Sequence, residues 1–235
     1  MAERKNGTLT PTSGDGPRGL RGWVLRQGVE RALKAQQPLV TARIAAIRRK
    51  KPNATPAEVI TTLGRQYRTA VALTGAGGGA LAIVPALGTV ASLATATTEA
   101  VATLDAAVLY TLAVAEVHAL PTDEPQRRQA IVLGVVVGQG AQEALQKLAG
   151  RSRGWAEDVT DRLPIGRLGA LNAFLVRWFA KRFLIRQGTL ALGRALPLGI
   201  GVAIGVTGNL AIARAVIRSA EQAFGPPPAT WPGHG

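Results

Sequence analysis

The side chains that could carry out chemistry are few and widely spaced in this 235-residue sequence. Cysteine is absent and only two histidines occur, which excludes disulfides, thiol nucleophiles and multi-histidine metal sites. Asp105 and Glu116 share a helix face but lie about three turns apart, too far for joint acid–base catalysis. Glu116 and His118 fall on different faces, unlike the i, i+4 pair of a helical metal site. We therefore expect no catalytic, cofactor-binding or metal site, and a protein that is not an enzyme.

Other polar residues in apolar surroundings allow two interpretations each. Glu99 and Asp105 are either intramembrane acids with raised pKa values or helix-face residues that pair with arginine or face water, and we favour the second. We interpret His118 as a residue at a helix C-terminus rather than as a metal ligand. Asn209 either forms a hydrogen bond across helices or caps its own helix, and the sequence leaves both open.

Three uncharged runs dominate the hydropathy pattern: residues 69–98, 129–142 and 195–213. A helix that spans a bilayer needs about 20 apolar residues, so the first and last runs are long enough to do so. Each run contains a Gly-x-x-x-Gly pair, which lets two helices approach closely and is enriched among membrane helices. The predicted helix-packing glycines are Gly75, Gly79, Gly134, Gly138, Gly201 and Gly205.

Apolar residues recur at helical spacing along most of the chain, whereas strand patterns are scarce. Thr55, Pro56 and Glu58 predict the capped start of a long helix, and the glycines and Pro85 of the first apolar run predict a bend or hairpin. The expected fold is all-α: about seven or eight helices with Gly/Ala-rich apolar hairpins, membrane-associated or membrane-embedded. The expected divisions are a disordered leader (1–17), a basic helical arm (18–54), a helical domain (55–224) and a Pro/Gly-rich tail (225–235).

Positive charge flanks an apolar middle. Residues 1–68 carry 14 cations and 4 acids, residues 69–150 carry 3 and 6, and residues 151–235 carry 11 and 4. Such a chain attracts either an anionic membrane surface or nucleic acid. In the aromatic stretch 165–187, the cations are not cleanly segregated from the apolar residues on a helical wheel. The predicted lipid-headgroup contacts are Arg48, Arg49, Lys50, Lys51, Arg177, Trp178, Lys181, Arg182 and Arg186.

Several motifs, most of them rich in glycine and alanine, follow one another along residues 72–209. They are Ala72-Leu-Thr-Gly-Ala-Gly-Gly-Gly, Pro85-Ala-Leu-Gly, Ala113-Val-Ala-Glu-Val-His and Leu196-Pro-Leu-Gly-Ile-Gly, which leads to Asn209. Over residues 55–224 the chain resembles the EcsC family of bacterial α-helical proteins, although His118-Ala119 stands where that family's pattern has an aromatic residue and glycine. The resemblance implies a hydrophobic, membrane-linked protein, with a genetic link to ABC exporters and secretion in the namesake's case. It implies no catalytic residues.

The sequence thus favours a non-enzymatic helical protein at the cytoplasmic membrane, with its basic regions on the cytoplasmic side and an accessory role in transport or secretion. Anionic lipid is the expected partner, no cofactor is expected, and a membrane-protein partner or a homo-oligomer stays open. A soluble all-α interaction protein with a Gly/Ala core is the alternative. Non-specific nucleic-acid binding through the basic arm ranks third, because no base-reading motif is present.

Overall fold

The computed structural model describes residues 37–81, 89–138, 140, 141, 143, 145, 154–194 and 200–232, of which 37, 75–81, 89–100, 180, 182–194 and 200–206 are described by their backbone alone. Within these residues the structure contains seven helices with defined ends and no strand. The predicted all-α class is confirmed. The helices are α2 (Gln37–Lys50), α3 (Pro56–Leu81), α4 (Thr89–Val117), α5 (Pro125–Val137), α7 (Trp155–Asp161), α8 (Ile165–Arg194) and α9 (Ile200–Phe224).

Local sequence signals explain where two helices begin. At the start of α3, the Thr55 amide donates to the Glu58 carboxylate (2.8 Å), and the Glu58 amide donates to Thr55 Oγ1 (3.3 Å). This is the predicted capping box, which satisfies two amides that a helix N-terminus otherwise leaves without partners. At α5 the Arg127 amide donates to the Glu124 carboxylate (2.7 Å), with Pro125 at the first helical position.

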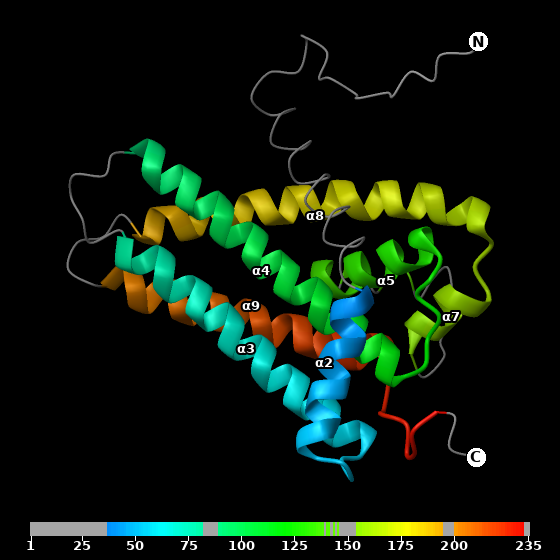
Figure 1. Ribbon diagram of the computed structural model, residues 1–235. Helices are drawn as coiled ribbons and strands as arrows, with labels where there is room; N and C mark the ends of the chain where they lie inside the picture. Colours follow the sequence, from blue (N-terminus) through cyan, green and yellow to red (C-terminus); the bar gives the residue numbers. More distant parts are fainter. Residues whose placement is uncertain are drawn as a thin grey trace, which may run out of the picture.

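The first apolar run is divided between α3 and α4, which run side by side as an antiparallel pair (Figure 1). The last apolar run enters α9, which packs more extensively against α3 than against any other described helix. Asn209 of α9 donates to the Val71 carbonyl of α3 (3.3 Å). Further along, a Cβ added at Gly64 would lie 3.7 Å from Ile217 Cδ1. The pairs 71–209 and 64–217 show that α3 and α9 are antiparallel.

α5 contacts four of the described helices: α4, α7, α8 and α9. Consecutive residues Ala130 to Val135 are all buried, so every face of this helix is covered by protein. A helix that is covered all round needs no polar face. α5 ends at Gly138, whose φ is +82°. That conformation favours glycine and breaks the α-helical path.

No helix in the part of the chain that the structure describes is both long and apolar enough to cross a membrane. The transmembrane helices predicted from the uncharged runs are therefore not supported. The part of the uncharged run 129–142 that lies in α5 forms a core helix, since other helices of the same chain enclose it.

Residues on both sides of the predicted helical domain pack into one core with it. Val40, Ile44 and Ile47 of α2 are buried in that core, and α2 contacts α4 and α3. After α9, the chain turns at Gly225 (φ +73°) and returns to α2. We call residues 225–232 the C-terminal strap; they were predicted to be a tail. The predicted leader 1–17, and residues 18–36 of the predicted basic arm, lie outside the described residues.

Candidate functional site

The outer face of α8 combines three cations with an exposed aromatic ring. Arg167, Arg177 and Lys181 are exposed, and Phe174 lies between them with 42% of its surface accessible. At 100° per residue these four positions fall within a sector of about 80°, so they share one side of the helix. We call these four residues the α8 face. The 30 residues of α8 contain six cations and no acid.

The opposite side of α8 fixes this orientation. Leu168, Leu171, Leu175 and Phe179 are buried against the core, and α8 contacts α5 and α9. Asn172 on the same side donates from Nδ2 to the Gln126 carbonyl (2.9 Å) just inside α5. Burial of the leucines stabilises this docking by about 1.5–3 kcal/mol per side chain. Cations and apolar residues are not cleanly segregated on the helical wheel of residues 165–187 because Phe174 lies on the cationic side. The other described apolar residues of this stretch largely face inward.

Trp178 differs from its predicted role as a headgroup contact. Its indole is half-buried, and a Cβ at Gly140 would clash with that ring. The Phe174 and Trp178 rings lie 5.8 Å apart between centroids, at an angle of 39°. Trp178 therefore packs α8 onto the chain near Gly140 and supports the exposed Phe174 ring from beside it.

The cations of the α8 face have no acidic partner within the described part of the chain. None of Arg167, Arg177 and Lys181 forms a salt bridge with an acid among the described residues. Their charge is therefore available to an external anion. The side chains of Arg182 and Arg186, which were also predicted to contact headgroups, lie outside what the structure describes.

The second predicted cation cluster ends α2. Arg49, Lys50 and Lys51 are exposed, and cations in the last turn of a helix are stabilised by its macrodipole. Arg48 differs from its neighbours, because its guanidinium lies 4.4 Å from the centroid of the Trp231 ring. α2 packs on α3 and α4, whereas α8 packs on α5 and α9, and the two lie on opposite sides of the bundle in Figure 1. The two cation clusters are thus separate surfaces.

The predicted helix-packing residues have different surroundings in the structure. A Cβ at Gly134 would clash with the Trp155 ring and lie 2.7 Å from Leu145 Cδ1, so this glycine makes room for side chains. Gly138 corrects the prediction: it ends α5, and a Cβ there would have no atom within 4 Å. Asn209 is buried and donates across helices to the Val71 carbonyl, which is one of its two predicted roles. The surroundings of Gly75, Gly79, Gly201 and Gly205 lie outside the described residues.

The acids and histidine considered for chemistry are not brought together as a group. No cluster of three or more potential metal ligands occurs among the described residues. His118 follows the last residue of α4, where its Nδ1 lies 2.9 Å from the Val114 carbonyl. Asp105 is half-buried, and burial raises its pKa above the ordinary value of 3.8. The side chain of Glu99 lies outside the described residues.

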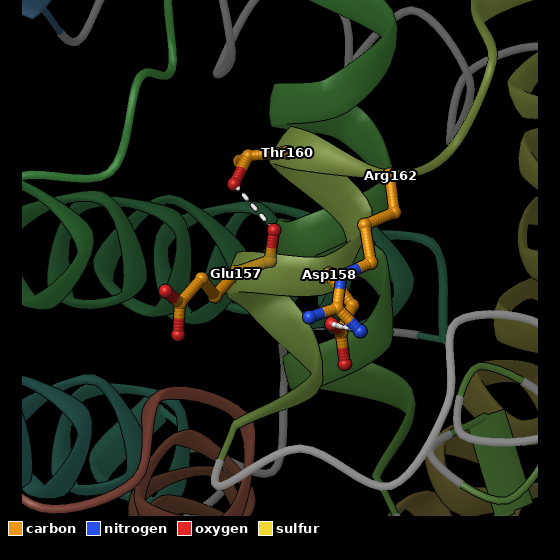
Figure 2. A network of polar contacts seen from close by, with 4 residues as sticks. All are labelled: Glu157, Asp158, Thr160 and Arg162. Atoms are coloured by element: carbon orange, nitrogen blue, oxygen red, sulfur yellow. Dashed lines mark hydrogen bonds and ion pairs between the residues drawn. The ribbon is translucent and has the colours of Figure 1, made fainter.

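A polar network on α7 is local to that helix (Figure 2). Arg162 Nη1 lies 3.1 Å from Oδ1 of the buried Asp158, one turn earlier. Thr160 Oγ1 donates to the Glu157 carbonyl (2.8 Å). Both contacts join residues within one helical turn of each other, so they stabilise α7 and leave no converging set of reactive groups.

Sequence reasoning missed residues that only long-range packing places. Arg167 was not included among the headgroup contacts, although its spacing of seven from Phe174 could have indicated a shared face. Trp231 was assigned to a tail, and no local signal predicts its contact with Ala54 (2.9 Å). A Cβ at Gly154 would lie 2.6 Å from the Ala223 carbonyl oxygen, a long-range approach that no local signal predicts.

Comparison with known proteins identifies no relative: no family model, no curated protein and no solved structure matches this chain. The resemblance to the EcsC family therefore stays a prediction.

Proposed function

We propose that this protein is a non-enzymatic, peripheral membrane-binding protein that docks on anionic lipid through the α8 face. The single observation that carries the proposal is the exposed Phe174 ring among Arg167, Arg177 and Lys181, on a helix without acids. An exposed aromatic ring can enter the membrane interface while the cations around it contact anionic headgroups. Such docking requires no helix that spans the membrane.

The expected free energy of membrane binding is that of a reversible association. Cations near an anionic surface contribute about 1 kcal/mol each, so the three described cations supply about 3 kcal/mol. Insertion of the exposed part of Phe174 adds about 1 kcal/mol, since full burial of such a side chain contributes about 1.5–3 kcal/mol. The result is weak attachment by one copy, which a second copy or further cations would strengthen.

Phe174 is also the reason to prefer lipid over nucleic acid. Phosphates of either partner would bind the cations, but a bilayer surface additionally accepts an exposed apolar ring without any specific pocket. Single-stranded nucleic acid could stack a base on that ring. The two partners therefore need a direct comparison.

The test is flotation of the full-length protein with vesicles in which the anionic lipid fraction is increased at constant size. Under this proposal, the bound fraction rises with anionic lipid and falls as salt is added, because the Debye length shortens to about 8 Å at physiological ionic strength. Phe174→Ser should weaken binding about five- to tenfold, as expected for about 1 kcal/mol. Exposed Leu39→Ser on α2 is the matched control and should leave binding unchanged.

Two results would overturn the proposal. One is equal binding to neutral and anionic vesicles, or binding to neither. The other is tight binding to single-stranded or duplex DNA that anionic vesicles fail to compete with, which would assign the α8 face to nucleic acid.

A further inference from the structure

A cavity of about 510 Å³ lies between α3, the C-terminal part of α4, the end of α9 and the first residues of the strap. This volume lies within the range of about 300–1,000 Å³ that small-molecule sites occupy. Three aromatic rings line it: Tyr110, His118 and Phe224. The His118 and Phe224 rings are stacked, with centroids 5.4 Å apart and an angle of 29°. Pro226 and Pro227 of the strap form the outer wall.

The charge of the cavity is opposite to that of the chain. Among the described residues that line it, Glu221 carries the only carboxylate, and no lysine or arginine is present. Glu221 forms no salt bridge with a described residue, although the chain has 28 cations and 14 acids. An unpaired carboxylate beside aromatic rings is a favourable site for an organic cation, because the ring faces also attract positive charge.

Hydrogen-bonding groups in the lining can accept from a ligand. His118 Nδ1 lies 2.9 Å from the Val114 carbonyl, which can only accept, so Nδ1 is the donor. In the neutral ring Nε2 is then an acceptor, and this buried atom has no partner among the described residues. Burial, and then the Glu221 charge, raise the pKa of Tyr110, while Arg68 opposes them with a smaller effect.

We propose that the cavity binds the protonated amine of a small organic molecule, with the ammonium group at the Glu221 carboxylate and the apolar body against the Tyr110 and Phe224 rings. The assignment is independent of lipid docking by α8, because the two sites share no residue. Carboxylate and ring faces together select a cation over an isosteric neutral or anionic molecule.

Three probes of matched shape test the selection: 2-phenylethylamine, 2-phenylethanol and 3-phenylpropionate, each titrated into the full-length protein and followed by calorimetry and ligand-observed NMR. The amine should bind about tenfold more tightly than the alcohol, and the carboxylate should bind most weakly. Glu221→Gln should remove the preference for the amine and leave the affinity for the alcohol unchanged. Glu157→Gln, an exposed carboxylate outside the cavity, should change neither affinity.

Thr61 offers a second variant that does not depend on the carboxylate. It is exposed on α3 and lines the cavity, so Thr61→Trp should fill the space and block the amine while the helical circular dichroism stays unchanged. The proposal is overturned if the alcohol binds as tightly as the amine, if Glu221→Gln lowers both affinities equally, or if no probe binds at millimolar concentration. Competition by glycerophosphoethanolamine separates the two sources of an ammonium group: displacement assigns a lipid headgroup, and its absence assigns a free amine.

Discussion

The indole Nε1 of Trp231 donates a 2.9 Å hydrogen bond to the backbone carbonyl of Ala54, 177 residues earlier in the chain. Ala54 is buried in the turn between α2 and α3, and the Arg48 guanidinium lies over the Trp231 ring at 4.4 Å. One side chain of the C-terminal strap therefore provides a hydrogen-bond donor to a buried turn and an aromatic face to a cation. The C-terminal strap therefore links the C-terminal end of the described chain to the end of α2 and the turn that follows it.

Substitution of Trp231 should separate these contributions. Trp231→Phe keeps a ring under Arg48 but leaves the Ala54 carbonyl without its donor, which should cost about 1–2 kcal/mol of unfolding free energy. Trp231→Ala also removes the ring and its packing, and should cost about 1–2 kcal/mol more. Urea unfolding followed by circular dichroism measures both values. Equal stability of the three proteins would show that the strap does not stabilise the bundle.

Glycines in different surroundings should respond oppositely to the same substitution. Gly134→Ala brings a Cβ into the Trp155 ring and should destabilise the protein by about 1–3 kcal/mol through overpacking. Gly169→Ala on α8 adds a Cβ that has no atom within 4 Å and should stabilise the helix by about 0.5–1 kcal/mol. Thermal unfolding of the two variants checks the signs, and a stabilising Gly134→Ala would contradict the described packing at Trp155.

Both tyrosines of the chain should resist ionisation until the protein unfolds. Tyr67 and Tyr110 are stacked at 5.0 Å, and burial raises the pKa of each well above the ordinary value of 10.0. The folded state therefore keeps protons that the unfolded state releases above pH 10.0. Stability is unaffected by these groups below that pH and falls as pH rises above it, by about 1.4 kcal/mol per pH unit for each tyrosine.

An alkaline titration checks this by recording phenolate absorbance and helical circular dichroism together. The two signals should change in one step, because ionisation requires unfolding. Tyr67→Phe leaves Tyr110 as the sole tyrosine and should halve the phenolate amplitude without separating the signals. Phenolate that appears near pH 10 while the helical signal is intact would contradict the burial of the pair.

The parts of the fold that were predictable depend on neighbours in sequence. The Thr55–Glu58 capping box spans one helical turn, so its geometry follows from residue type and spacing alone. The contact between Trp231 and Ala54 joins residues 177 positions apart, which no local pattern specifies. The uncharged run 129–142, which lies partly in α5, is shorter than the about 20 residues that span a bilayer, and its burial by other helices agrees with an enclosed core helix.

The candidate site was predictable to a similar extent. Arg177 and Lys181 were recognised from composition and are exposed as a headgroup contact requires. The partial burial of Trp178 was not predictable, because it depends on packing near Gly140, which lies in a different part of the chain. The significance of Phe174 also came from packing, since the buried leucines on the other side of α8 determine that this ring faces outward.

The measurement that tests the central claim most directly compares two triple variants in anionic vesicle binding. R167Q/R177Q/K181Q neutralises the α8 face, whereas R49Q/K50Q/R65Q removes the same three charges from exposed positions of α2 and α3. If the α8 face is the docking surface, the first variant should bind about a hundredfold more weakly, as expected for about 3 kcal/mol, and the second should stay close to the parent protein. Equal weakening in both variants would show that only net charge matters, and a larger loss in the second would contradict the assignment to α8.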